Sequence, residues 1–282
     1  MLSQIRQDKK LLFGLLGFGS GALGGLVAEI TGPDQKGTYV ISLISVALWA
    51  ALAAMVIAIG LYWAINVYSH RKTDWPVLLK KAIPAGLVAG AISGSVAQAI
   101  FGLLQFQSGS LMQLTFQAGC WGIMGCLLGL ALSFSIRNLG ALKAIIAGAI
   151  GSFIGGFGFL LSGIFIPATL GRMFGIGILG AALGLSLIIV EERYRSAYLE
   201  VHWAPNESSK FTLGSRPISI GGGSEDDIFV YGIPHHAMSL WLERGKLKGI
   251  YHVTGEHKEL HDGSPIKFGK IEMIVRIIQS QR

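Results

Sequence analysis

The order of apolar and polar residues divides the chain into two regions. Residues 11–190 are almost continuously apolar and rich in glycine, whereas residues 191–282 alternate between short apolar runs and polar turns. A transmembrane helix needs about 20 mainly apolar residues to cross about 30 Å of hydrocarbon. Six segments meet this requirement, and we predict a membrane-spanning helix in each: 11–31, 40–67, 82–104, 113–134, 142–165 and 169–190.

The second region has the pattern of a small β-domain. Turns that contain glycine, such as those at Gly245 and Gly263, separate its short runs, and frequent short strands of this kind indicate a sandwich or a barrel. We therefore divide the chain into a six-span transmembrane domain, residues 1–192, and a β-sandwich domain, residues 193–282. Strands are predicted near 197–203, 210–213, 217–220, 227–230, 237–242, 249–253, 265–268 and 271–279.

Composition and charge agree with this division. The mean hydropathy is +0.56 and only 14% of residues are charged, whereas about 25% is usual for soluble domains. The formal net charge of +7 arises mainly in residues 1–192, which hold 11 Lys+Arg against 6 Asp+Glu. Positive loops beside membrane spans explain this excess, so the charge does not call for a nucleic-acid partner.

The basic residues also favour one orientation. They lie on alternate sides of the predicted spans, with Arg172 as the exception, and cytoplasmic loops carry an excess of such residues. Both termini are therefore expected in the cytoplasm, in a multi-pass protein of a cell membrane such as a bacterial inner membrane. The residues that decide this orientation are Arg6, Lys9, Lys10, Arg71, Lys72, Lys80, Lys81, Arg137, Lys143, Arg193 and Arg195.

Small residues recur at regular positions along the predicted helices, as if one helical hairpin were present three times. Such strips let helix backbones approach closely. They predict a tightly packed anchor in the lipid bilayer and, as a further partner, a second copy of the chain joined through the strips. The strips are Gly17, Gly21 and Gly25; Gly86, Gly90 and Gly94; Gly148, Ser152 and Gly156; and, on the even helices, Ala51, Ala54 and Ala58; Gly122, Gly125 and Gly129; Gly177, Gly180 and Gly184.

A transport pathway is the alternative interpretation of the membrane region. Ionisable residues inside a bilayer usually mark such pathways, but Glu29 and Arg172 lie near span ends, where they reach the interface. The remaining polar candidates are uncharged: Asn66, Gln98 and Gln117. Transport predicts that these three side chains converge on a water-accessible cavity, and a simple anchor predicts a glycine-packed interior.

Three segments of the β-domain carry a family resemblance. Residues 211–230 end in Ile-Gly-Gly-Gly-Ser-Glu-Asp-Asp-Ile-Phe-Val, residues 233–240 read Ile-Pro-His-His-Ala-Met-Ser-Leu, and residues 260–269 read Leu-His-Asp-Gly-Ser-Pro-Ile-Lys-Phe-Gly. In this order and spacing they resemble the motifs of the forkhead-associated (FHA) domain. The resemblance implies an eleven-stranded β-sandwich that binds phosphothreonine peptides through loops at one end. A glycine-rich multi-span region before such a domain is similar to the build of several FHA proteins.

The residues that would hold phosphate in that family are largely replaced here. Gly222 stands for the arginine after Ile-Gly, Ile233 for the serine and Pro234 for the second arginine. His236 matches the family's histidine, which braces the loops, and Thr254 falls near its asparagine. Because phosphate sites depend on charge-assisted hydrogen bonds, this pattern weakens the expectation of phosphopeptide binding in the usual mode.

Substitute donors are present in the same loops. The amides of residues 221–224 could form an anion-binding nest, the Ser224 hydroxyl could donate, and His235 becomes charged below its pKa of about 6.5. Three alternatives stay open: phosphopeptide binding, a phosphate-independent protein contact, and a purely structural domain. The partner-binding loops are expected to include Gly222, Gly223, Ser224, His235, His236 and Thr254.

Catalytic and metal-binding patterns are missing from the sequence. It has no Gly-x-Ser-x-Gly motif and no P-loop, and no cysteine or carboxylate grouping completes a metal set with its histidines at familiar spacing. Cys120 and Cys126 project from different faces of one predicted helix. We therefore expect no enzyme activity, metal or cofactor. The sequence favours a membrane-anchored module for a cytoplasmic protein or phosphoprotein over a small transporter or channel regulated by the β-domain. Ser/Thr phosphorylation-linked signalling is the setting that the family resemblance implies.

Overall fold

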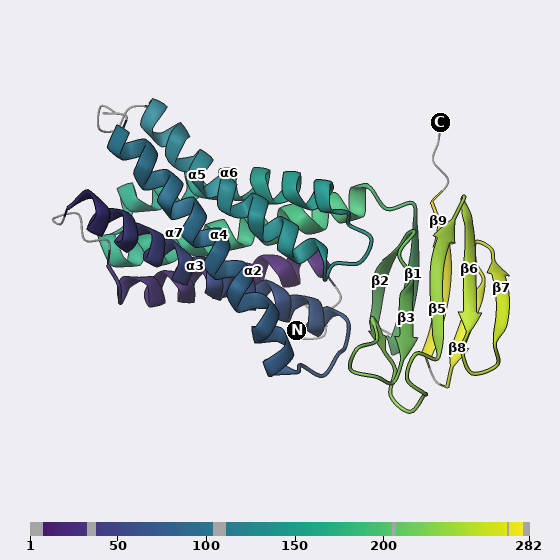
Figure 1. Cartoon of the computed structure of the whole chain (residues 1–282). Coiled ribbons are helices and arrows are strands. Elements are labelled where there is room, and N and C mark those ends of the chain that lie inside the picture. The colour runs from purple at the N-terminus through teal and green to yellow at the C-terminus, as the bar shows by residue number, and fades with distance from the viewer. Residues whose placement is uncertain (1–7, 33–37, 104–110, 205–206, 270, 279–282) are drawn as a thin grey trace.

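A helical bundle is followed by strands in two sheets (Figure 1). The computed structural model describes residues 8–32, 38–103, 111–204, 207–269 and 271–278; Arg6 and the predicted element ends at 104 and 279 lie outside them. Six described helices are long and apolar enough to cross a membrane, which confirms the predicted fold class. They are α2 (Lys9–Glu29), α3 (Tyr39–Tyr68), α4 (Trp75–Leu103), α5 (Leu111–Ser133), α6 (Ala141–Phe165) and α7 (Ala168–Arg193).

One helix begins well before its predicted span. Helix α4 starts at Trp75 rather than at residue 82, because Asp74 supplies a favourable start by accepting a hydrogen bond from the Val77 N–H at 3.4 Å. The added turns include the exposed Lys80 and Lys81, which a hydropathy pattern excludes from a membrane span. The helix therefore extends beyond its apolar part.

The glycine strips pack against helices of the same chain. A Cβ atom added to Gly17 of α2 would meet the backbone of Gly180 in α7, and one added to Gly90 of α4 would meet the backbone of Ala50 in α3. In the third pair, Gly148 of α6 lies against Gly125 of α5. Because the strips are used inside the chain, they give no support to the expected homo-oligomer. The threefold repeat of the hairpin stays a prediction.

The described strands form two sheets that face each other. One sheet has the order β2-β1-β9-β8 and the other the order β4-β3-β5-β6-β7, so the structure describes nine strands where the family resemblance implies eleven. Their bounds are β1 (Ala197–Ala204), β2 (Glu207–Leu213), β3 (Ile218–Gly221), β4 (Ile228–Phe229), β5 (Met238–Glu243), β6 (Lys246–Tyr251), β7 (Glu256–Leu260), β8 (Pro265–Phe268) and β9 (Ile271–Ile277).

Strand β7 is absent from the predicted set. It pairs antiparallel with β6 at the edge of its sheet, and its first four residues, Glu-His-Lys-Glu, are all exposed. A strand without an apolar face shows no alternation of apolar and polar residues, so the pattern gives no signal for it.

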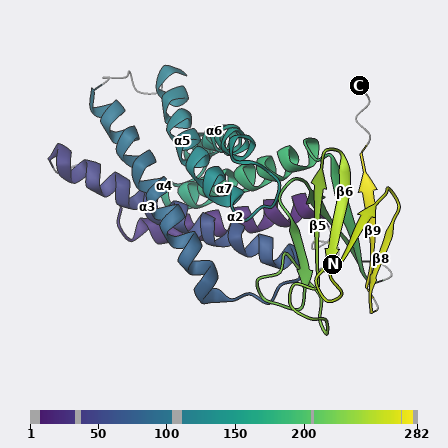
Figure 2. The same ribbon diagram turned by 45° about the vertical axis from the view of Figure 1, so that its right-hand side comes forward.

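The sandwich lies at one end of the bundle, which we call the proximal end, and its strands run across the direction of the helices (Figure 1 and, after rotation, Figure 2). Its core contains Leu199, Ile220 and Met273, all fully buried. Leu12 of α2 and Tyr68 of α3 belong to this same core, so the two halves share apolar contacts at the proximal end.

Candidate interaction site

Three loops of the sandwich meet at one end, which we call the loop end. They comprise residues 222–227 after β3, residues 230–237 before β5, and residues 252–255 between β6 and β7. They share this end because β3 and β6 run opposite to β5. All six residues predicted for the partner-binding loops lie here: Gly222, Gly223, Ser224, His235, His236 and Thr254.

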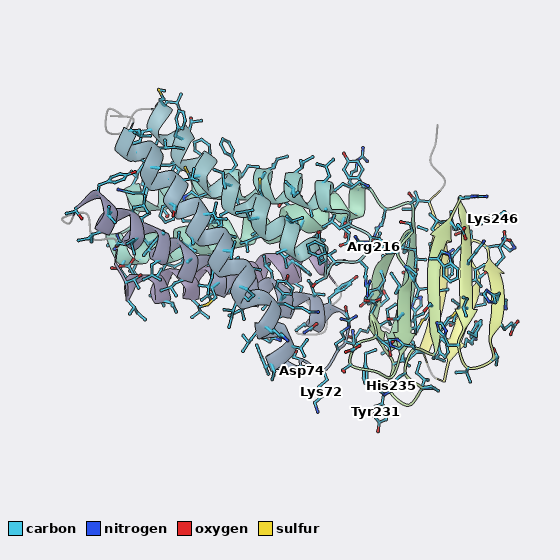
Figure 3. The ribbon with its side chains drawn as sticks, in the orientation of Figure 1. Lys72, Asp74, Arg216, Tyr231, His235 and Lys246 are labelled. Carbon is cyan, nitrogen blue, oxygen red and sulfur yellow. The ribbon has the colours of Figure 1, made fainter. Side chains whose placement is uncertain are left out.

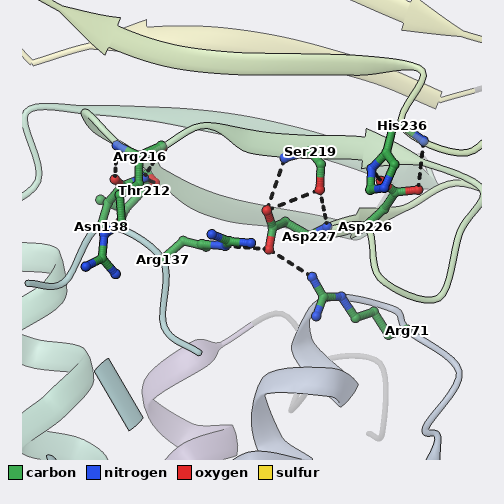
Figure 4. A network of polar contacts seen from close by, with 9 residues as sticks. All are labelled: Arg71, Arg137, Asn138, Thr212, Arg216, Ser219, Asp226, Asp227 and His236. Atoms are coloured by element: carbon green, nitrogen blue, oxygen red, sulfur yellow. Dashed lines mark hydrogen bonds and ion pairs between the residues drawn. The ribbon is translucent and has the colours of Figure 1, made fainter. Parts of the chain in front are cut away.

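The carboxylate of Asp226 ties two of these loops together (Figure 4). Its Oδ2 accepts hydrogen bonds from the Gly223 N–H at 2.8 Å and from the His236 N–H at 3.2 Å. Its Oδ1 lies 2.6 Å from the Nδ1 of His236. Asp226 is fully buried, and a buried carboxylate is tolerated only where donors surround it. These contacts give the loops a fixed shape.

The predicted anion-binding nest is therefore wrong in its central part. The Gly223 amide donates to Asp226, and the Gly222 amide donates to the carbonyl of Pro234 at 3.0 Å. Amides that already have acceptors inside the protein cannot also donate to an external phosphate. Asp226 did not figure among the predicted site residues, although it stands in the Asp-Asp-Ile motif that carries the family resemblance.

The remaining predicted residues have different surroundings. His235 is exposed beside Gly223, and Ser224 lines a pocket described below. Thr254 is exposed, and its hydroxyl accepts a hydrogen bond from the Glu256 N–H at 3.4 Å. The structure thus brings these residues to one end of the sandwich without joining them into one polar cluster.

An exposed tyrosine marks the loop end. Tyr231 is 90% exposed, and Figure 3 shows its side chain and that of His235 at the edge of the molecule. Exposed aromatic side chains are enriched at protein interfaces because they bury a large area with little loss of conformational entropy. The sequence alone does not reveal that Tyr231 is exposed, because tyrosine is also a frequent residue of partly buried β-strands.

The neighbouring carboxylate, Asp227, joins the sandwich to the bundle (Figure 4). Its Oδ1 accepts from the Nη2 of Arg71 at 3.0 Å and from the Nε of Arg137 at 2.8 Å. Its Oδ2 accepts from the Ser219 N–H at 3.1 Å. The two arginines come from the α3–α4 and α5–α6 connections. Burial lowers the pKa of the Arg71 guanidinium, and the charge of Asp227 offsets part of that change.

Further hydrogen bonds hold strand β2 against the bundle. The Tyr68 hydroxyl donates to the Lys210 carbonyl at 3.0 Å and accepts from the Lys210 N–H at 2.7 Å. The Asn138 amide donates to the Thr212 carbonyl at 3.0 Å. Together with the Asp227 contacts, these bonds form what we call the junction. It makes the sandwich an integral part of the folded chain.

A pocket of about 390 Å³ opens where the junction meets the loop end. Ser224, Glu225 and Asp227 of the β3–β4 loop line it together with residues of α3, the α3–α4 connection, α4 and the α5–α6 connection. We call it the junction pocket. Asn66, one of the three polar residues considered for transport, belongs to this pocket.

A second cavity, of about 540 Å³, lies among the helices at the end of the bundle far from the sandwich. Gln98 and Gln117 both line this distal cavity, and so does Arg172, whose Nη2 donates to Glu29 at 2.7 Å. Two of the three polar residues thus converge, and Asn66 does not. Trp49, Trp121 and Phe159 also line the cavity, and their aromatic rings pack against one another with centroids 5.2–6.4 Å apart.

Comparisons with known proteins add little to this geometry. The chain matches no protein-family model and no curated protein. Among solved structures, Mycobacterium tuberculosis EmbR in complex with a low affinity phosphopeptide is similar at 14% sequence identity over 97% of this chain and 73% of that chain, with a TM-score of 0.25. A TM-score this low supports no statement about fold or ligand. In the part of the chain that the structure describes, no three His, Cys, Asp or Glu residues are grouped to hold a metal ion.

Proposed function

We propose that this protein is a membrane-anchored interaction module, in which six helices fix an FHA-like sandwich at the cytoplasmic surface. Six apolar helices support the anchoring, and the junction supports a fixed position of the sandwich. The cytoplasmic orientation follows from the distribution of lysine and arginine. A protein partner of the cytoplasm would bind at the loop end.

The state of the loop amides favours a partner contact that needs no phosphate. A phosphothreonine group carries a charge of about −1.5 to −2 and requires several strong donors. At the loop end the amides of Gly222 and Gly223 are engaged, and a buried carboxylate, Asp226, lies directly beneath them. That negative charge would repel a phosphate placed on the same backbone.

The single observation that carries the proposal is the exposed face of the loop end. Asp226 fixes the loops in one shape, and Tyr231 and His235 project from them. A fixed loop frame with an exposed aromatic side chain has the properties of a protein-binding surface, because little conformational entropy is lost on binding. The proposed partner-binding residues are Tyr231 and His235.

Binding to peptide libraries tests this proposal. The full chain in lipid nanodiscs is applied to unmodified peptides and to the same peptides with phosphothreonine. We expect binding to unmodified sequences, with Tyr231→Ala weakening the affinity by about tenfold because an interface tyrosine is often a dominant contact. Lys246→Ala serves as the control, because Figure 3 shows Lys246 at the far end of the sandwich; its affinity is expected to stay within about twofold.

Two results would contradict the proposal. One is binding that occurs only with phosphothreonine, which would restore the usual FHA mode. The other is an equal effect of Tyr231→Ala and Lys246→Ala, which would remove the loop end from recognition.

A second candidate function is transport or binding of a small molecule in the membrane region. The observation in its favour is the distal cavity, which gathers Gln98, Gln117 and Arg172. Polar side chains that line a cavity between helices are typical of substrate sites in membrane proteins.

The two native cysteines provide a test of water access to this cavity. Cys120 lines it, whereas Cys126, about 1.7 turns further along α5, does not. If water fills the cavity, a charged, membrane-impermeant methanethiosulfonate reagent should label Cys120 at least about tenfold faster than Cys126, because thiols in lipid or packed protein are shielded from it. Labelling followed by intact mass spectrometry gives both rates. Equal, negligible labelling of both thiols would count against transport.

A further inference from the structure

The junction pocket has an unusual concentration of charge for a space beside membrane helices. Its basic lining residues come from three parts of the chain: the α3–α4 connection, the first turns of α4 and the α5–α6 connection. They are Arg71, Lys72, Lys81 and Arg137. The acidic lining residues are Asp74, Glu225 and Asp227. Four positive and three negative charges leave a net charge of +1.

Two of the four cations are available to a ligand. Asp227 already pairs with both arginines. Lys72 and Lys81, in contrast, are exposed, and neither has a carboxylate partner among the described residues. Arg71 also keeps a buried Nε–H without an acceptor in the described part of the chain. Asp74 and Glu225 also have no basic partner among the described residues and equal the two lysines in number, so the net charge of +1 comes from Arg71 and Arg137 beside Asp227. The pocket therefore keeps one net positive charge and has several hydrogen-bond donors that its described residues do not use.

The uncharged lining suits a molecule with both polar and apolar parts. Ser224 adds a hydroxyl from the β3–β4 loop, and Leu78 and Phe134 add apolar surface from the helix ends. A volume of about 390 Å³ lies within the range of about 300–1,000 Å³ that is usual for small-ligand sites. The pocket opens where helices α3, α4 and α5 reach the proximal surface, next to the lipid headgroups that would surround them.

We propose that the junction pocket binds a phosphate group, either that of an anionic lipid headgroup from the adjoining leaflet or a soluble phosphate. Lys72 and Lys81 would pair with the phosphate oxygens, and the Ser224 hydroxyl would donate to them. Basic pockets at the ends of membrane helices commonly hold anionic lipid headgroups. The net charge of +1 matches the single negative charge of a phosphodiester.

This site is distinct from the FHA mode of phosphate binding, because most of its donors come from the membrane half. It is also independent of the proposed partner contact, since neither Tyr231 nor His235 lines the pocket. Failure of one proposal therefore leaves the other unaffected. A ligand bound in the junction pocket would contact both the α3–α4 connection and the β3–β4 loop.

Native mass spectrometry of the purified full chain tests the proposal. The probes are a short-chain phosphatidylglycerol, a diacylglycerol with the same acyl chains but no phosphate, and inorganic phosphate. We expect one phosphatidylglycerol to be retained in preference to diacylglycerol. Lys81→Gln should weaken this retention by about fivefold. The double variant with both Lys72→Gln and Lys81→Gln should weaken it further.

Lys80→Gln is the matched control. It removes the same charge one residue away on the same exposed turn, but Lys80 does not line the pocket, so retention should change by less than about twofold. If inorganic phosphate binds with the same dependence on Lys81 and displaces the lipid, the site takes soluble phosphate. If Lys80→Gln and Lys81→Gln weaken lipid retention equally, or if neither probe depends on Lys81, the proposed site is wrong.

Discussion

Two adjacent carboxylates, Asp226 and Asp227, stabilise different parts of the structure. Asp226 accepts hydrogen bonds from two loops of the sandwich itself. Asp227 faces the bundle and accepts from Arg71 and Arg137. One dipeptide of the β3–β4 loop thus contributes both to the shape of the loop end and to the position of the sandwich.

Replacement of Asp227 by asparagine should therefore weaken the junction. The variant keeps the size of the side chain but leaves Arg71 half-buried without its counter-charge, and removing one partner of a buried pair costs about 3–5 kcal/mol. Pulse proteolysis in urea, with the full chain in detergent, measures the free energy of unfolding of the sandwich. Glu272→Gln is the control, because it removes only an exposed pair with Lys267 and should change the free energy by less than about 1 kcal/mol. An equal loss of unfolding free energy in the two variants would show that the contacts of Asp227 do not stabilise the junction.

The sequence predicts some of these residues and not others. The FHA resemblance indicates a bracing role for His236, and the structure shows His236 in contact with Asp226. The partners of Asp227 are out of reach of any local pattern, because Arg71 and Arg137 lie 156 and 90 residues away from it. In the sequence, Arg71 and Arg137 indicate only the orientation of the membrane spans. In the structure, the same two side chains also bind Asp227 of the sandwich.

At the scale of the element, the helices depend on close backbone contact. Gly17 and Gly19 both lie in α2, but a side chain on Gly17 would meet the backbone of Gly180 in α7, whereas a side chain on Gly19 would meet open space. The pattern of small residues identifies the strip but not its partner. Helix α2 packs on α7, which is the last membrane helix in the sequence. No local sequence pattern predicts that pairing.

Gly17→Val should accordingly destabilise the bundle by about 2 kcal/mol or more, because backbone atoms cannot move aside as side chains can. Gly19→Val on the same helix should change stability by less than about 1 kcal/mol. Unfolding in a series of SDS mole fractions, followed by tryptophan fluorescence, compares the two variants. Similar midpoints for both would contradict the close contact of α2 with α7.

Elements differ in how well the sequence predicts them. Each membrane helix is predicted because about 20 apolar residues are a strong signal on their own. Most strands of the sandwich are predicted because one of their faces is buried and the other is not. Strand β7 fails this condition because both its faces are largely exposed.

At the scale of the whole molecule, the compositional break near residue 190 does not separate two independent bodies. Apolar side chains of α2 and α3 belong to the core of the sandwich, and residues of α3, the α3–α4 connection, the α5–α6 connection and α7 form hydrogen bonds with it. The sequence predicts the two halves because each has its own periodicity. It does not predict the junction, which is built from residues that look ordinary in their own segments.

The contact of Tyr68 with Lys210 has a consequence for solubility. Strand β2 is an outer strand of its sheet, and an outer strand with unpaired backbone groups invites strand addition and aggregation. Tyr68 satisfies both the N–H and the carbonyl of Lys210, and Asn138 satisfies the carbonyl of Thr212. The membrane half thus shields this strand in the way that a neighbouring strand would. A sandwich released from its helices by proteolysis would expose this edge and become prone to self-association.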